Sequence, residues 1–364
     1  MSEERSNPQA KTRSVNQYNQ AVDLHLIETS EEQNLLIDNV KAWADSTISS
    51  KSQHWDEEQE LPANLLREAE ELGLYAIAVK ENLGGFEMGY ESAIATVELL
   101  ARYEPSLALK IAILNGPVAS LWPEELPLDE ATWASGSLQV NGMGATGQLS
   151  DVAWGESAKW LLLPQGDRLY VIDLQSERVT KRPQRDRLGL RCADWVDLQL
   201  DGAPTLAFPL RRRDRLTAQA WMNLGWSAIA IGAGAAGLHE GLQYATDRKQ
   251  FGQAISEFQA IQWMIADSVT ELDAARLLTY EAARALVSEE PWSVKEGVRL
   301  AAQARLLAAE AGHQACDRAL QIHGGYGYTR EYLVEKYWRD VQRTYPAEGR
   351  DMLNRLILNG LNED

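Results

Sequence analysis

The sequence has few of the residues that build disulfide frameworks, metal sites or membrane spans. Its 364 residues include two cysteines, Cys192 and Cys316, which lie far apart with no metal-ligand spacing around either, and its five histidines form no metal-like cluster. No apolar run approaches the roughly 20 residues of a membrane-spanning helix. The N-terminus has no apolar core of the kind found in secretion signals. We therefore expect no disulfide, no metal site, no membrane contact, and a cytoplasmic protein.

Positive charge is scarce as well. The chain has 35 Lys and Arg residues against 53 Asp and Glu residues, a formal net charge of -18. A surface that acidic repels phosphate backbones, which argues against nucleic acid as a partner. Any phosphate-bearing ligand would therefore need a local basic patch. The chain is 45% hydrophobic, enough to bury a large core in two or three domains.

The hydrophobic pattern changes its period along the chain. Residues 1–28 are polar and predict a flexible tail. Residues 29–117 carry apolar side chains at helical intervals, starting from a capping-box-like Ser30. Residues 118–214 contain short runs typical of a small antiparallel sheet or barrel, and residues 215–364 are mainly helical again. We predict an α+β protein with an N-terminal helical domain, a central β domain and a C-terminal helical bundle.

One segment suggests a different fold. Gly232-Ala-Gly234-Ala-Ala-Gly237 follows an apolar run and matches the G-x-G-x-x-G pattern of a Rossmann dinucleotide site. The rest of a βαβ unit is missing, because the next roughly 20 residues stay helical and no second strand ends in an acid. We therefore predict that these glycines lie inside a helix and let another helix approach closely.

Arg248-Lys-Gln-Phe251-Gly252 combines a cation with an aromatic ring. A guanidinium can bind pyrophosphate oxygens with two hydrogen bonds, and a phenyl ring can offer an apolar surface to a cofactor. The same residues also suit an ordinary helix end, with an arginine near the helix dipole and a glycine cap. The pattern alone leaves both interpretations open.

A second glycine-rich segment, Gln321-Ile-His323-Gly324-Gly325, has the same ambiguity. Its backbone N–H groups could approach a phosphate-bearing ligand, or the glycines could simply end a helix. We interpret His323 as a hydrogen-bonded structural histidine, since no nucleophile motif lies near it.

Near the end of the chain, Tyr345-Pro-Ala-Glu348-Gly349 places a lone carboxylate between small residues, and an apolar pattern resumes at Arg355. A glutamate on such a bend can be aimed into a cleft and act as a general base. Most glutamates after a turn are solvated charges, so this signal depends on its context.

Together with Arg339-Asp340, these segments resemble the C-terminal half of the flavin-dependent acyl-CoA dehydrogenases, in matching order and spacing. The resemblance covers the chain from about Thr29 and implies an N-terminal helical domain, a small central β domain and a C-terminal four-helix bundle. It implies FAD as cofactor, acyl-CoA or another acyl thioester as substrate, and an electron-transferring flavoprotein as electron acceptor.

The resemblance also implies roles for residues. Glu348 would take the α-proton of the thioester while the β-hydrogen leaves as hydride to flavin N5, and burial would raise the pKa of Glu348 toward neutrality. Arg248 would reach the FAD of a neighbouring subunit, which implies a homo-oligomer, a dimer of dimers. The implied FAD contacts are Arg248, Phe251, Gln259, Gln321, Gly324 and Gly325.

Some segments of the family pattern are missing. The Thr-Glu-Pro-x-Ala-Gly-Ser-Asp stretch is absent from a shortened central region, and Asp151-Val-Ala-Trp-Gly155 replaces Trp-Ile-Thr-Asn. Asn223 stands where an arginine is expected, and Arg350-Asp351 follows Glu-Gly in place of Thr-Ser. These changes fall on flavin-ring and substrate contacts. Two alternatives therefore stay open: a weakly active or non-catalytic subunit of a hetero-oligomer, and a dehydrogenase of carrier-protein-bound acyl groups.

Overall fold

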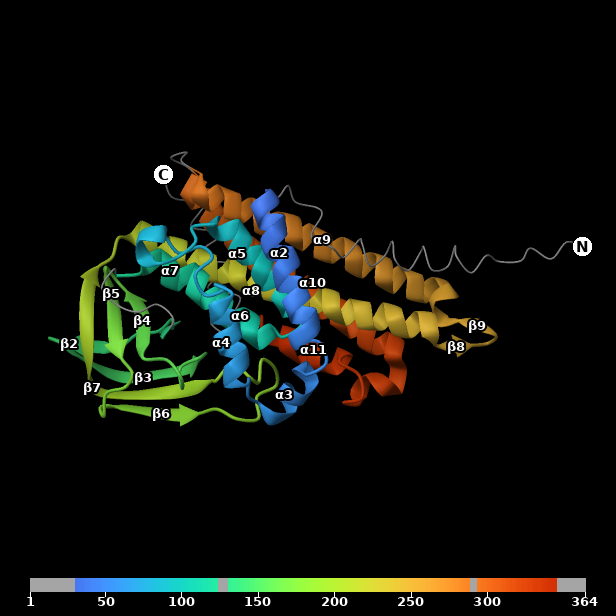
Figure 1. Cartoon of the computed structure of the whole chain (residues 1–364), viewed down its shortest axis with the longest axis horizontal. Coiled ribbons are helices and arrows are strands. Elements are labelled where there is room, and N and C mark those ends of the chain that lie inside the picture. The colour runs from blue at the N-terminus through green and yellow to red at the C-terminus, as the bar shows by residue number, and fades with distance from the viewer. Residues whose placement is uncertain (1–29, 124–129, 289–292, 346–364) are drawn as a thin grey trace, which may run out of the picture.

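The computed structural model describes residues 30–123, 130–288 and 293–345. Figure 1 shows long helices running side by side, with a sheet against one end and a small hairpin at the opposite end. The predicted order of helices, strands and helices is confirmed. The predicted tail and Glu348 lie outside the described residues, and the predicted domain boundaries stay predictions.

The N-terminal part is helical. Ser30 caps the first helix, and its side chain and that of Gln33 form the expected capping box. Glu104 caps a later helix by accepting a hydrogen bond from Ser106 N at 3.1 Å. The helices are α2 (Glu31–Thr47), α3 (Ser52–Glu58), α4 (Ala63–Glu71), α5 (Gly89–Ala101), α6 (Pro105–Ile113) and α7 (Ala119–Leu121), with a 3-10 turn at Glu81–Leu83 and a π-helical turn at Leu114–Val118.

The central part is a seven-stranded sheet. Its strands are β1 (Ala131–Trp133), β2 (Gln139–Asn141), β3 (Gly144–Val152), β4 (Trp160–Gln165), β5 (Arg168–Asp173), β6 (Val179–Pro183) and β7 (Val196–Pro209). The order is β1-β4-β5-β7-β3-β2, with β6 also paired to β7. All pairs are antiparallel except β1 with β4. A tight hairpin turn joins β4 to β5, since Gln165 pairs with Arg168 and Gly166 has a φ of 61°.

The C-terminal part consists of α8 (Arg212–Asp247), α9 (Gln259–Val287), α10 (Ser293–His323) and α11 (Val334–Gln342), which pack together. A hairpin of β8 (Lys249–Gln250) and β9 (Gln253–Ala254) and a 3-10 turn at Ile255–Glu257 join α8 to α9, and another 3-10 turn at Gly324–Tyr328 follows α10. No helix in the described ranges is both long and apolar enough to cross a membrane.

The three glycines of the G-x-G-x-x-G match lie inside α8, so the prediction of a helix is confirmed and the Rossmann alternative is wrong. A Cβ on Gly232 would lie 2.2 Å from Glu98 O in α5, and a Cβ on Gly234 would lie 2.7 Å from Gly312 Cα in α10. Small residues thus allow α8 to contact two helices at backbone distance. With 36 residues, α8 is about 54 Å long and connects the sheet end of the molecule to the hairpin end.

A buried charge cluster joins the N-terminal helices to α11. We call Asp56, Glu104, Lys336, Arg339 and Asp340 the Lys336 cluster. Lys336 Nζ lies 3.2 Å from Glu104 Oε2 and 2.8 Å from Asp340 Oδ2, and all three side chains are almost fully buried. Burial alone would lower the pKa of Lys336, but Asp340, Glu104 and Asp56 hold it well above its ordinary value. The ammonium therefore stays charged inside the protein.

A second cluster joins the sheet to the end of α11. Asp151 lies at a bulge of β3 with a φ of 60°, and its carboxylate oxygens lie 2.7 Å from Arg187 Nη2 and 3.1 Å from Arg343 Nη2. Both guanidinium groups lie over the ring of Trp195, with carbon-to-centroid distances of 4.7 Å and 4.5 Å. Burial would raise the pKa of Asp151, but Arg343 and Arg187 hold it below its usual range.

The close contact of α8 with α10 predicts the effect of Gly234→Ala. The added Cβ would meet Gly312 Cα at 2.7 Å, so helices must separate, and we expect a loss of about 1–3 kcal/mol in the free energy of unfolding by urea. Gly116→Ala is the matched control, because its Cβ would lie 3.4 Å from Trp221 Cβ, an ordinary contact. Equal stability of the Gly234 variant and the wild type would contradict this packing.

The ion pairs of Asp151 with Arg187 and Arg343 predict a pH-dependent effect of Asp151→Asn on stability. Because the folded-state pKa of Asp151 lies below its unfolded value, the stabilisation is complete at pH 7 and is lost as the pH falls below about 4. The side chain is 42% exposed, so we expect a loss of only about 1 kcal/mol at pH 7, measured by thermal unfolding. The exposed Asp201→Asn serves as control. A difference from wild type that persists unchanged at pH 3 would refute the ionic origin.

Candidate functional site

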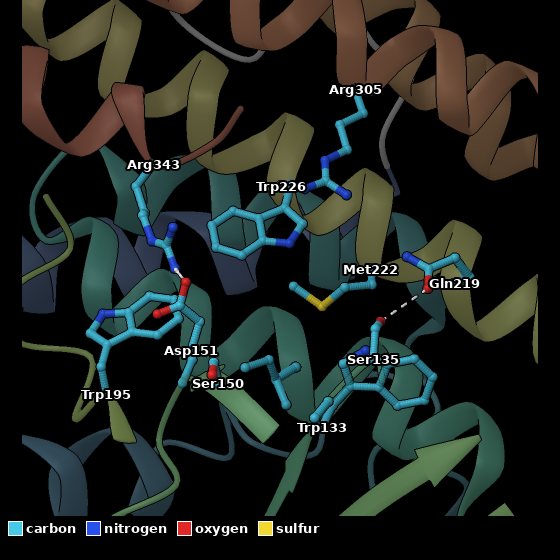
Figure 2. Close-up of a pocket in the computed structure, with 13 residues that line it drawn as sticks. Trp133, Ser135, Ser150, Asp151, Trp195, Gln219, Met222, Trp226, Arg305 and Arg343 are labelled. Atoms are coloured by element: carbon cyan, nitrogen blue, oxygen red, sulfur yellow. Dashed lines mark hydrogen bonds and ion pairs between the residues drawn. The ribbon is translucent and has the colours of Figure 1, made fainter. Parts of the chain in front are cut away.

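A cavity of about 310 Å³ lies between the sheet and α8 (Figure 2). The sheet side contributes the end of β1 and the residues that follow it, the end of β3 and the residue after it, and Trp195 just before β7. The helical side contributes residues of α6, α8 and α10, and the segment after α11 contributes Arg343. Among the described residues, the lining is Ile113, Trp133, Ala134, Ser135, Ser150, Asp151, Ala153, Trp195, Gln219, Met222, Trp226, Arg305 and Arg343.

Three side chains of α8 face this cavity. Gln219, Met222 and Trp226 are spaced by three and four residues, which places them on one face of the helix. Figure 2 shows Met222 and Trp226 pointing into the cavity, while Gln219 points toward Ser135. The Gln219 Oε1 atom lies 3.5 Å from Ser135 Oγ. The helix therefore supplies an apolar wall with a polar edge.

Arg305 brings a buried positive charge to the same cavity. Its side chain is 3% exposed, and its Nη1 donates a hydrogen bond of 2.9 Å to Asn223 Oδ1. Asn223 is the position where the resemblance led us to expect an arginine on α8. The structure instead places the guanidinium of Arg305, which comes from α10, next to Asn223 on α8.

The cavity has a local excess of positive charge in an acidic protein. Its charged lining residues, among those the structure describes, are Arg305, Arg343 and Asp151, and Asp151 is already paired with Arg343 and Arg187. Hydroxyls from Ser135 and Ser150 complete the polar part of the lining. Such a site suits a flat, electron-rich ligand that needs aromatic walls and hydrogen-bond donors at its edge.

The predicted cofactor residues lie at the other end of the molecule, near the β8–β9 hairpin (Figure 1). Arg248 follows α8, Phe251 lies in the hairpin turn and is 92% exposed, and Gln259 begins α9. Gln321 lies near the end of α10, followed by Gly324 and Gly325, where an added Cβ would meet nothing within 4 Å. The structure thus brings the six predicted residues to one end of the helical bundle.

Two further cavities lie at this hairpin end. Arg248 lines one of about 440 Å³ together with His323 and Tyr326. Gln321 and Gly324 line another of about 400 Å³. His323 is 2% exposed, its Nδ1 lies 2.8 Å from Ala319 O, and its ring stacks on Tyr244, as expected for a structural histidine.

The two ends are too far apart to hold one small ligand of the same chain. Trp226 and Arg248 are separated by 22 positions along one helix and its cap, which is about 33 Å. The predicted base, Glu348, lies outside the described residues. Within the described part of the chain, no group of three or more His, Cys, Asp or Glu side chains is placed to hold a metal ion.

The sequence interpretation missed most residues of the cavity in Figure 2. Arg305 had a detectable signal, because it is the only charged residue in the apolar run from Leu300 to Ala309, and an arginine in such a run is typical of a buried, paired charge. Trp226 had none, since a tryptophan on a buried helix usually belongs to the core. Ser150 directly precedes the Asp151–Gly155 segment that departs from the family pattern, and its place in the same cavity as Ser135 required the sheet to be known.

Comparison with known proteins gives consistent matches. The sequence model described as acyl-CoA dehydrogenase, N-terminal domain, matches residues 30–122, and the corresponding C-terminal domain matches residues 217–359. These two matches leave the central region between them, where the sequence departs from the family pattern.

Relatives support the same grouping. The chain is 27% identical to the probable acyl-CoA dehydrogenase YngJ of Bacillus subtilis over 380 residues, which is 91% of this chain and 98% of that protein. It is 32% identical to the caffeyl-CoA reductase–Etf complex subunit CarC of Acetobacterium woodii over 206 residues, which is 54% of this chain and 52% of that protein.

Among solved structures, butyryl-CoA dehydrogenase from Megasphaera elsdenii superimposes with a TM-score of 0.82 at 20% identity, over 93% of this chain and 100% of that one. The fold therefore extends over nearly the whole chain, including the shortened central region. Because both terminal domains match and the fold agrees throughout, the protein belongs to the acyl-CoA dehydrogenases, a family of FAD-dependent flavoprotein oxidoreductases.

Proposed function

We propose that this protein catalyses the FAD-dependent α,β-dehydrogenation of an acyl thioester, with acyl-CoA as the first candidate substrate. The observation that carries the proposal is the cavity of Figure 2, which combines aromatic walls, hydroxyl groups and two arginines between the sheet and α8. In a member of this family, such a lining fits a flavin ring and a thioester next to it.

The lining suggests a role for each side of the cavity. Trp133 offers a flat apolar surface to a ring, and Ser135 and Ser150 offer hydroxyl donors to its polar edge. FAD, when bound, would accept the hydride from the β-carbon. The positive charge of the site would stabilise the negative charge that the flavin gains when it accepts the hydride.

Glu348 is the proposed α-proton base. It follows Arg343, which lines the cavity, by five positions in the sequence. A positioned carboxylate contributes on the order of 10²–10⁴-fold to such a proton abstraction.

The separation of the two ends supports a homo-oligomer. Arg248 lies about 33 Å from Trp226 of its own chain. We therefore propose that Arg248 and the other predicted residues of the hairpin end bind FAD held by a neighbouring subunit. Arg248 is exposed at the end of α8, where its guanidinium is suited to bind a pyrophosphate. The electrons would pass to an electron-transferring flavoprotein, a proposal supported by the Etf complex named for the relative from Acetobacterium woodii.

A second candidate is a subunit that completes the cofactor site of a different partner chain. The hairpin end carries all of the predicted FAD contacts, whereas the central region, which borders the cavity, departs from the family pattern. A purified protein that is colourless alone and becomes yellow with a second subunit would favour this candidate. A yellow protein reduced by acyl-carrier-protein thioesters and not by acyl-CoAs would favour a carrier-bound substrate.

Replacing Arg248 with Ala tests the proposed cofactor contact. We expect a loss on the order of 1.5–3 kcal/mol of FAD binding, or a Kd weakened roughly 10- to 150-fold, because a charge-assisted hydrogen bond to pyrophosphate disappears. Titration of the flavin-depleted protein with FAD gives the Kd. The adjacent exposed Lys249→Ala removes the same charge and should change the Kd much less. Wild-type affinity in the Arg248 variant would show that this arginine does not bind the cofactor.

Replacing Glu348 with Gln tests the proposed base. The amide keeps the shape of the side chain and removes its basicity, so flavin and thioester should still bind while flavin reduction slows by at least roughly 10²-fold. Anaerobic stopped-flow bleaching with a panel of acyl-CoAs measures the rate, and Asp351→Asn is the control for a nearby loss of charge. Equal rates in wild type and the Glu348 variant would exclude the assignment. A wild type that no thioester bleaches would favour the non-catalytic subunit.

A further inference from the structure

We propose that Trp226 sets the length of acyl chain that the cavity accepts and restricts this protein to short acyl groups. The inference rests on the proposed function and adds the substrate class to it. Trp226 and Arg305, whose guanidinium lies against the indole, both belong to the described part of the chain.

The first observation is the small size of the cavity. Its volume of about 310 Å³ lies at the lower end of the roughly 300–1,000 Å³ found for small-molecule sites. A flavin ring and the reacting end of a thioester would have to share this space. Any side chain that projects into it therefore decides how much remains for the acyl chain.

Trp226 is the largest side chain on the helical wall. It lies one turn beyond Met222 on α8 and points toward the middle of the cavity, between Arg305 and Met222 (Figure 2). A tryptophan side chain buries roughly 150–250 Å² of surface, so its truncation would open the wall more than any other change on this face of α8.

A cation–π contact holds the indole in place. The guanidinium carbon of Arg305 lies 5.7 Å from the centre of the Trp226 ring system, and Arg305 is fixed to α8 through Asn223. The indole therefore cannot turn aside without disturbing a buried guanidinium.

The chemistry of the lining points to an acyl chain at this wall. Ile113, Met222 and Trp226 give the helical side a mainly apolar surface, whereas the sheet side mixes the indole of Trp133 with the hydroxyls of Ser135 and Ser150. An acyl chain gains most by contact with the apolar side, because each buried methylene contributes about 0.8 kcal/mol, a factor of about four in binding. A chain that reaches the indole would gain no further methylene contacts and would meet steric resistance.

The experiment compares chain-length profiles of the flavin-loaded protein with those of Trp226→Ala and Trp226→Phe. Anaerobic flavin bleaching by butyryl-CoA and octanoyl-CoA gives the rate constant and the Kd for each thioester. For wild type we expect butyryl-CoA to be preferred. In Trp226→Ala the ratio of octanoyl to butyryl specificity should rise by about tenfold or more, with a smaller rise in Trp226→Phe.

A binding measurement without turnover accompanies the rates. Crotonyl-CoA and 2-octenoyl-CoA, the corresponding products, perturb the visible spectrum of the oxidised flavin when they bind next to it, which gives a Kd for each chain length. The change in selectivity should appear in this Kd ratio, since the indole acts by occupying space and takes no part in proton or hydride transfer.

The matched control is Trp221→Phe, the same substitution on the same helix at a ring that does not line the cavity. It should keep the wild-type chain-length ratio. Bleaching of wild type by butyryl-CoA together with an unchanged ratio in both Trp226 variants would overturn this inference and leave the proposed function intact. A wild type that prefers octanoyl-CoA would overturn it as well. If no acyl-CoA bleaches or perturbs the flavin of any variant, both the proposed function and the inference fail.

Discussion

The buried ammonium of Lys336 is the interaction on which the relative positions of the three parts depend. It contacts Glu104 at the start of α6 and Asp340 on its own helix, and Asp340 also accepts a hydrogen bond of 2.6 Å from Leu190 N. Glu104 accepts another from Ser52 Oγ at 2.7 Å. A buried ion pair of this kind is expensive to form, but removing one partner leaves an uncompensated charge and costs about 3–5 kcal/mol. The cluster therefore permits one arrangement of these segments.

This arrangement determines how the end of α11 meets the sheet. A Cβ on Gly189 would lie 2.1 Å from Arg339 O, so the loop before β7 contacts α11 at backbone distance. One helical turn after the buried residues, Arg343 reaches Asp151 on β3 and lines the cavity. The Lys336 cluster thus helps to fix the segment that carries Arg343 to the cavity wall.

The helices and the family could be predicted because their signals are local. Ser30, Pro62 and Gly73 mark helix boundaries, and the small residues of α8 indicate close helix packing in one stretch of sequence. Strand β3 had no such signal, because Gly144, Gly147 and Asp151 interrupt its alternation and its pairing with β7 supplies the missing information. The cavity was harder still, since its described lining comes from seven separate segments. No periodicity relates Trp133 to Arg305; they line one cavity only after the sheet has packed on the helices.

The relation between Asn223 and Arg305 explains why a departure from a family pattern is a poor guide to lost function. Read along the chain, the arginine expected on α8 is missing. In space, Arg305 of α10 donates to the residue that replaced it, and α8 and α10 are held at backbone distance by Gly234 and Gly312. A guanidinium supplied from the neighbouring helix keeps the positive charge and changes the direction from which it arrives. From this direction Arg305 also lies over Trp226. One guanidinium therefore contacts both Asn223 and the bulky indole of the cavity wall. The absence of an arginine at position 223 therefore does not remove positive charge from the cavity, because Arg305 brings a guanidinium to it.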